Sequence, residues 1–238
     1  MRSKLLVPRK KLMKSHSDNN RKWEVGKGSP SQARVCFDIE TGPEPLGVIR
    51  ELMPKFKAPS SYKSEEAIKK NLDKQALKYI ADAPLDAVTG KILAIGYSHM
   101  DEDEVFVFAN DSERELIKEF WDYYCQINSA TWIGHNSNSF DWPFIVRRSM
   151  KHGVTFPMEF YNPIKWMKNL VDTMDVYGLG EYQKRISLDR LAKFVGAGGK
   201  TGSGAGFYDK WLNDREAALE YLENDVRLTK AVWDKVGW

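Results

Sequence analysis

The chain has 238 residues, of which 42% are hydrophobic, so it can bury one substantial core and is most simply a single domain with extensions. Its two cysteines form no C-x-x-C motif and its four histidines are scattered, which excludes a zinc site and a disulfide framework and suits a reducing compartment. No apolar run approaches the ~20 residues of a membrane span. We therefore expect no membrane partner and a cytoplasmic or nucleoid-associated protein.

The basic charge is concentrated at the N-terminus. Residues 1–30 hold nine Lys or Arg and two Asp or Glu, a balance of +7, which leaves −4 for the rest of a chain whose net charge is +3. We predict that residues 1–33 form a flexible basic arm and that residues 34–238 form the folded domain. The arm fits three roles, namely a solubilising tail, a polycationic phosphate-binding segment and an organellar targeting peptide. Its excess of lysine over arginine argues against targeting.

The first predicted strand ends in two acidic residues. Side chains alternate along a strand, so Asp38 and Glu40 face away from the apolar side formed by Val35, Phe37 and Ile39. The Thr-Gly pair that follows is expected to break the strand and to leave both acids at its C-terminal end. Two neighbouring carboxylates repel each other, and a divalent cation would relieve that repulsion. Taken alone, the pair also fits a solvated strand end.

A proline-containing insertion, residues 43–90, follows this strand. Within it, Ser64 is predicted to cap a helix with an apolar stripe on one side. The other side carries lysines at four positions: Lys69, Lys70, Lys74 and Lys78. Such a row is either a solvated face or a guide for a nucleic-acid backbone.

The remaining predicted elements alternate between strands and helices. They are a hairpin of strands 91–98 and 104–108, a helix at 113–127, a strand at 130–134, a helix from residue 141 to Gly153, a strand at 170–174, a helix at 188–195 and a last helix at about 214–236. The glycine-rich stretch 196–206 lacks the first glycine of a P-loop, because position 194 is Phe, and is expected to be a connector or a lid.

Two further motifs follow the acidic pair in a definite order. Asn136-x-x-x-Phe140-Asp141 opens a predicted helix 101 residues after Glu40, and Tyr221 and Asp225 share one face of the last helix. With Asp38-x-Glu40, these motifs resemble the tyrosine branch of the DEDD superfamily of 3′–5′ exonucleases.

The second motif gives the resemblance a closer direction. The stretch Gly134-His-Asn-Ser-Asn-Ser-Phe-Asp-Trp-Pro-Phe144 is most similar to the second motif of the proofreading exonuclease domain of family-B DNA polymerases. The likeness extends over about residues 34–233. It implies an α/β, ribonuclease-H-like fold: a five-stranded mixed sheet of order 3-2-1-4-5, with strand 2 antiparallel and helices on both faces.

The resemblance also implies roles for five residues. Asp38, Glu40, Asp141 and Asp225 would ligate two divalent metal ions, Mg²⁺ or Mn²⁺, with Asp38 bridging the pair. Tyr221 would orient the attacking water. Hard cations prefer oxygen ligands, and a metal pair can both activate water and stabilise the leaving oxygen, so these residue types suit phosphodiester hydrolysis.

Four other residues are candidate substrate contacts. Phe140 and Trp142 could stack on bases, Asn136 could hydrogen-bond near the scissile phosphate, and Thr41 could meet the terminal nucleotide. Each has a structural alternative: the two aromatic side chains fit a core equally well, and Asn136 could cap the following helix. Asp172 is expected to bind local backbone groups and not a metal ion.

These features predict a metal-dependent 3′–5′ exonuclease that releases nucleoside monophosphates from the 3′ ends of single-stranded DNA. A DNA polymerase or a repair complex is the expected partner. Two alternatives stay open, namely an RNA-trimming exonuclease of the same superfamily and a non-catalytic subunit that holds 3′ ends for a polymerase. Readout of a ribose 2′-hydroxyl would distinguish the first of these.

Overall fold

The computed structural model describes residues 33–127, 129–162, 164, 167–181, 184–199 and 206–237, so the predicted arm lies outside it except for Ala33. Its centre is a five-stranded sheet made of β1 (Arg34–Pro43), β2 (Gly90–His99), β3 (Phe106–Phe108), β4 (Thr131–Gly134) and β5 (Leu170–Asp172). The strand order is β3-β2-β1-β4-β5. β2 runs antiparallel to both of its neighbours, whereas β1, β4 and β5 are mutually parallel. The predicted order and orientation are confirmed.

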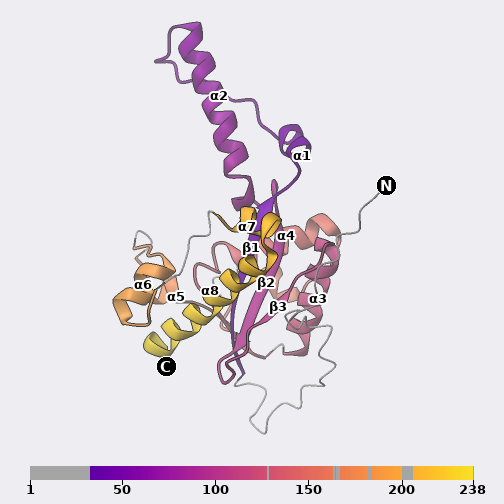
Figure 1. The fold of residues 1–238 in the computed structure, drawn as a ribbon, viewed down its shortest axis with the longest axis vertical. Helices are drawn as coiled ribbons and strands as arrows, with labels where there is room; N and C mark the ends of the chain where they lie inside the picture. Colours follow the sequence, from indigo (N-terminus) through magenta and orange to yellow (C-terminus); the bar gives the residue numbers. More distant parts are fainter. Residues whose placement is uncertain are drawn as a thin grey trace.

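Helices cover both faces of this sheet (Figure 1). One face carries α3 (Glu113–Gln126) and α4 (Asp141–His152), and the other carries α7 (Phe207–Asn213) and α8 (Arg215–Val236). α6 (Leu188–Val195) packs on α8, and α5 (Thr173–Gly178) follows β5. The short helices α1, α5 and α7 were not predicted, because six or seven residues are too few to display a helical period.

The alternation predicted for β1 places its side chains in two separate cores. Val35, Phe37 and Ile39 lie in a core with α3 and α4, where the Phe37 and Trp142 ring centroids are 4.5 Å apart. Cys36 lies in the core under α7 and α8. Asp38 and Glu40 share the α8 side of the strand.

The predicted break after Glu40 is wrong. β1 continues through Thr41 and Gly42 to Pro43, with a shift in register against β2 between Glu40 and Thr41. Pairing with β2 continues to Gly90, and this ladder outweighs the turn tendency of the Thr-Gly pair. At Gly42 a β-carbon would lie 2.7 Å from side-chain atoms of Leu93 and Tyr208, so a larger residue there would displace both of these side chains.

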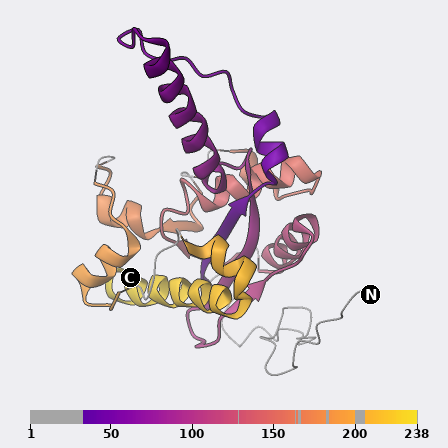
Figure 2. The same cartoon turned by 45° about the horizontal axis from the view of Figure 1, so that its top comes forward.

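The insertion forms an arm that projects from the body beyond the end of β1 (Figure 1, Figure 2). The projecting arm, residues 46–82, consists of α1 (Leu46–Glu51), an irregular segment and α2 (Glu65–Ala81). Ser64 caps α2 as predicted, its hydroxyl accepting a hydrogen bond from Ala67 N at 3.2 Å. No residue of α2 is buried.

Among the described residues, no helix has the length and apolar composition that would be needed to cross a bilayer.

Candidate active site

Three of the predicted metal ligands converge on the α8 side of the sheet. One ligand atom each from Asp38, Glu40 and Asp225 lie within 4.8 Å of one another. β1 supplies the first two and α8 supplies the third. α8 can approach the sheet closely at Gly96, where a β-carbon would lie 2.9 Å from the Leu222 side chain. A set of three carboxylates at this spacing fits a hard divalent cation, which takes oxygen ligands and offsets the mutual repulsion of the acids.

Tyr221 lies one turn before Asp225 on α8 and is only 4% exposed. Burial raises the pKa of the Tyr221 hydroxyl well above its usual value, and the charges of Asp225, Glu40 and Asp38 and a hydrogen bond with Asp225 raise it further. The hydroxyl is therefore protonated at neutral pH and acts as a hydrogen-bond donor beside the carboxylates.

Asp141, the first residue of α4, reaches the same stretch of β1 from the side on which β4 lies. β4 pairs with β1 only over Arg34–Cys36, so the Ile39 N–H is left without a partner on β4. Oδ1 of Asp141 accepts this N–H at 3.1 Å. The carboxyl thus contacts the backbone between Asp38 and Glu40, although it does not belong to the group of three acids whose ligand atoms lie within 4.8 Å.

Burial dominates the chemistry of Asp141, which is 3% exposed. Desolvation raises its pKa to about 7, the Ile39 N–H opposes the shift, and the charge of Asp172 adds to it. At neutral pH this carboxyl is thus poised between its protonated and ionised forms, and a cation placed nearby would favour ionisation.

The structure contradicts one proposed base contact and leaves another available. Trp142 is fully buried, and its ring lies 5.1 Å from Phe160 in the aromatic core, so it cannot stack on a base. The cause is the start of α4 at Asp141, which turns residue 142 toward the sheet. Phe140 is half-buried, packs on the same core and lies 5.4 Å from Phe144.

Asn136 does not cap α4. The N-cap residue is Phe140, and no side chain makes a capping hydrogen bond there. Asn136 instead adopts a left-handed conformation with φ of 62°, and its backbone carbonyl accepts the N–H of Phe140 at 3.0 Å. Its side-chain Oδ1 is buried without a hydrogen-bond partner among the described residues. This amide remains a candidate for contact with substrate.

Two other predictions have clear structural outcomes. The hydroxyl of Thr41 donates to the carbonyl of Pro84 at 2.7 Å, so it secures the base of the projecting arm. Asp172 accepts backbone N–H groups from Asn136, Asn138 and Met174 at 2.8–3.0 Å, which confirms its expected local role.

Sequence reasoning missed Lys210 on α7. Its Nζ lies 5.1 Å from the centroid of the Tyr221 ring, so it places a positive charge over the face of that ring. The pair Phe207 and Trp211, four residues apart and with stacked rings, was the available sign of a helix in this segment.

Comparison with known proteins agrees with this geometry. Residues 85–237 match a family described as predicted 3′–5′ exonuclease related to the exonuclease domain of PolB. DNA polymerase beta from two African swine fever virus isolates, one from a Namibian warthog and one from a South African tick, is 30% identical over 81 residues. That match covers 33% of this chain but only 7% of each viral polymerase.

A solved structure of the family B DNA polymerase from the archaeon Pyrobaculum calidifontis shares the fold. It is 19% identical, with a TM-score of 0.56, over 85% of this chain and 24% of the polymerase. The matched family region contains Asp141, Tyr221 and Asp225 and covers well over half of the chain. The chain therefore belongs to the family of predicted 3′–5′ exonucleases related to the exonuclease domain of PolB.

Proposed function

We propose that this exonuclease acts on the 3′ ends of single-stranded DNA, releases nucleoside monophosphates and depends on two divalent metal ions. The convergence of Asp38, Glu40 and Asp225 beside Tyr221 carries the proposal. All of the acids expected of the family are present, which disfavours a subunit that only binds 3′ ends.

The metal ligands would be Asp38, Glu40 and Asp225, with Asp141 joining them on the β4 side. When bound, Mg²⁺ or Mn²⁺ would lower the pKa of a coordinated water and would stabilise the negative charge that develops on the leaving 3′-oxygen. The protein residues define the place of reaction, because their oxygens gather around the middle of β1.

Tyr221 would position the attacking water. Its hydroxyl is held protonated by burial and by the neighbouring carboxylates, so it is a hydrogen-bond donor and not a general base. The oxygen of the water would attack the phosphorus of the terminal phosphodiester while the bond to the 3′-oxygen breaks. The products are a nucleoside 5′-monophosphate and a strand shortened by one nucleotide with a free 3′-hydroxyl.

Two side chains near the start of α4 support recognition of a single strand. Phe140 is only half-buried, and the Asn136 amide has an unused buried acceptor. A stacked base and a hydrogen bond near the last phosphate would hold a frayed 3′ end. Because similar regions occur within longer DNA polymerases, we propose 3′ ends handled by a polymerase or repair complex as the physiological substrate.

The test is digestion of 5′-end-labelled single-stranded DNA, duplex DNA and RNA with Mg²⁺ or Mn²⁺. We expect a ladder of shortened products, fastest on single-stranded DNA, and no turnover by Asp38→Ala. Asp122→Ala removes an exposed acid on α3 and is the matched control, which should keep full activity. A faster ladder on RNA would assign the substrate to RNA, and equal activity of Asp38→Ala would refute the proposed site.

A further inference from the structure

The projecting arm is rooted next to the proposed active site. β1 continues from Glu40 into Thr41, whose hydroxyl binds the carbonyl of Pro84 at the foot of α2. On the other side of the foot, Glu44 N donates to the carbonyl of Thr89 at 2.8 Å. The arm then extends away from the sheet beyond the end of β1 (Figure 1, Figure 2). A strand that leaves the site toward the arm would therefore pass along α2.

Contacts within the arm hold α2 against its own returning segment. The Tyr79 hydroxyl donates to the carbonyl of Leu52 at 3.2 Å, and Gln75 Nε2 donates to the carbonyl of Lys57 at 3.1 Å. The Phe56 and Tyr79 rings lie 6.0 Å apart at a steep angle. These contacts use one side of α2 and leave the opposite side open.

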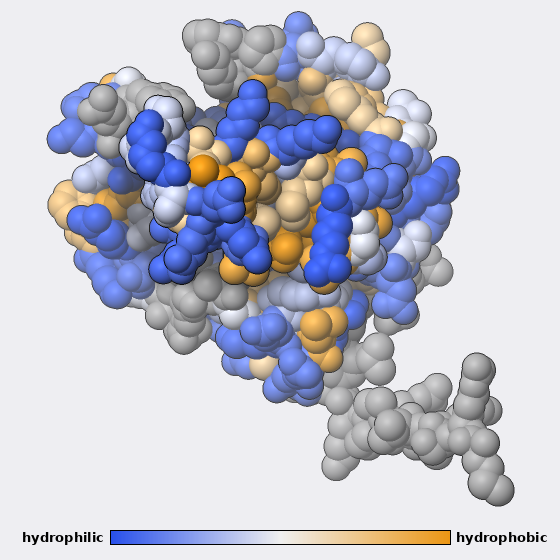
Figure 3. All heavy atoms as spheres, turned by 90° about the horizontal axis from the view of Figure 1, so that it is seen from above, coloured by the Kyte–Doolittle hydropathy of each residue, from blue (hydrophilic) through white to orange (hydrophobic). Residues whose placement is uncertain are grey.

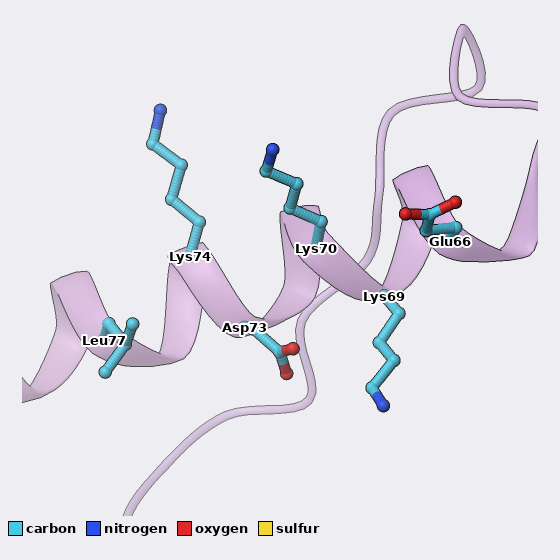
Figure 4. A pocket seen from close by; sticks show the side chains of 6 residues that line it. All are labelled: Glu66, Lys69, Lys70, Asp73, Lys74 and Leu77. Atoms are coloured by element: carbon cyan, nitrogen blue, oxygen red, sulfur yellow. The ribbon is translucent and has the colours of Figure 1, made fainter.

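The open side of α2 carries three lysines together with two acids, Glu66 and Asp73. The projecting arm as a whole is positive, because residues 46–82 hold eight Lys or Arg and five Asp or Glu, a balance of +3 on a domain that is otherwise acidic. Lys69, Lys70 and Lys74 are exposed and make no ion pair with any described residue, whereas Lys78 pairs with Asp82. Lys70 and Lys74 extend from the helix in the same direction, and Lys69 points to the other side of the open face (Figure 4). None of these lysines stabilises a core, because no residue of α2 is buried.

Apolar groups accompany the lysines along the arm. Leu77 is 68% exposed beside Lys74, and Leu52 and Tyr62 are also exposed. Seen from the side toward which the arm projects, the molecule shows hydrophobic surface bordered by hydrophilic groups (Figure 3). On the open face itself the apolar member is Leu77, because the carbonyl of Leu52 lies against Tyr79 on the other side of α2. The lysines are therefore the groups that would contact a nucleic-acid backbone.

We propose that the open face of α2 binds the phosphodiester backbone of the substrate upstream of the scissile bond. This inference rests on the proposed function and adds a length requirement to it. Lys69 to Lys74 extend over about 7.5 Å of helix, the length of about two nucleotides at ~3.4 Å per nucleotide, and they lie on an arm that projects beyond the end of β1. The arm therefore engages a long substrate and not a short oligonucleotide that fills only the active site.

The experiment compares Lys69→Ala/Lys70→Ala/Lys74→Ala with a matched control, Lys118→Ala/Arg147→Ala/Lys235→Ala. The control also removes three exposed helical cations, from α3, α4 and α8. Alanine keeps the helical tendency in both variants. The substrates are a single-stranded 5-mer, a single-stranded 25-mer and a 5-nucleotide 3′ overhang on a hairpin stem, each assayed for kcat and KM at several salt concentrations.

In the wild type and the control variant we expect a lower KM for the 25-mer than for the 5-mer. In the arm variant we expect the KM for the 25-mer to rise about tenfold, with kcat on the 5-mer unchanged. Loss of three phosphate contacts should reduce the slope of log affinity against log salt by about 2 for a single strand. A preference for the hairpin substrate that is lost in the arm variant would identify the duplex stem as the source of the backbone.

The two proposals fail differently. If the arm variant keeps the wild-type KM and salt slope on both long substrates, the arm does not bind nucleic acid and the inference is wrong, whatever the activity on the 5-mer. If the wild type degrades none of the substrates, the proposed function is wrong. Binding of labelled 25-mer to Asp38→Ala in Ca²⁺ still tests the arm in that case, through the same comparison of variants.

Discussion

Asp141 shows how one side chain can serve both the fold and the site. The Ile39 N–H that it accepts would otherwise be buried without a partner, because β4 has already separated from β1. The same position beside Asp38 and Glu40 makes its carboxylate a natural metal ligand. Without a cation, however, a buried acid is more favourable in its protonated form. Whether Asp141 stabilises or destabilises the fold thus depends on pH and on the presence of a metal ion.

The raised pKa of Asp141 predicts a decline of metal-free stability with pH. The folded pKa is about 7 and the usual value is 3.8, so between about pH 4 and pH 7 the folded protein holds a proton that the unfolded chain releases. The free energy of unfolding should therefore fall as pH rises through this range, by an amount on the order of a few kcal/mol. Denaturant unfolding curves of the wild type, recorded at several pH values in the presence of a chelator, should show this fall in the free energy of unfolding.

Asp141→Asn removes the titration of this group and keeps an oxygen for the Ile39 N–H, so its stability should decline less than that of the wild type over the same pH range. The remaining decline comes from Asp172, whose pKa is also raised by burial. Asp122→Asn on the exposed surface of α3 is the control and should behave as the wild type. Equal pH profiles for the wild type and Asp141→Asn would show that Asp141 is ionised in the metal-free fold.

Tyr221→Phe tests positioning separately from metal binding. The ring would stay in its buried place against Phe207, 6.1 Å away, and only the hydroxyl would be lost. Because that group is held protonated and oriented by Asp225, we expect kcat to fall about 100-fold with little change in KM. Steady-state kinetics would measure the effect. Retention of kcat would remove Tyr221 from the mechanism.

At the level of elements, Arg148 of α4 joins the parts of the fold from which the arm grows. Its buried guanidinium binds Glu44 after β1, Glu113 at the start of α3 and the carbonyl of Ala87 before β2. Burial alone would raise the pKa of Glu44, but the hydrogen bonds and charges of Lys151 and Arg148 outweigh it and hold the pKa below its usual value. Glu44 therefore stays ionised at neutral pH.

Arg148→Met should therefore be strongly destabilising. It leaves two buried or half-buried carboxylates without their shared cation, and breaking such a pair costs about 3–5 kcal/mol. Urea denaturation would measure this loss. Arg147→Met, one residue earlier and exposed on the same helix, is the control and should cost less than about 0.5 kcal/mol. A comparable small loss for Arg148→Met would show that the network does not contribute to stability.

The elements predicted correctly from the sequence are those whose pattern lies within the element itself and extends over several helical turns or a full strand. The cap at Ser64 and the glycine ends of α4 and α6, with φ of 61° at Gly153 and 72° at Gly196, follow from backbone chemistry within a few residues. Long-range pairing decided the rest. The continuation of β1 past Thr41 depends on β2, and no local pattern contains that partner.

The same distinction applies to the candidate site. Spacing and order along the chain indicated Asp38, Glu40 and Asp225, and the structure brings these together. The side that Trp142 faces depends on where α4 begins relative to the sheet, and its burial could not be read from a motif that runs through residues 136–144. Arg148 was missed because its partners come from segments 35 and more residues away.

For the whole molecule, the sheet separates an aromatic core from the site. The core with α3 and α4 is rich in packed aromatic rings, such as those of Trp132 and Tyr124, whose centroids are 5.4 Å apart. Such rings bury large apolar areas and stabilise this side of the sheet. The other side holds α8, whose first half brings Tyr221 and Asp225 to the acids of β1. These acids come from two elements that pack on each other, and they repel one another in the folded state. A metal ion that binds them therefore also stabilises the whole fold.

Divalent ions should accordingly raise the melting temperature. Ions that bind the folded acids but not the unfolded chain stabilise by about 2.7 kcal/mol at a concentration 100 times Kd. We expect Mg²⁺ and Mn²⁺ to raise Tm in thermal melts at constant ionic strength, and we expect the increase to disappear in Asp38→Ala. A wild-type Tm that is indifferent to both ions, or an equal increase in Asp38→Ala, would show that the acids of β1 and α8 do not form a metal site.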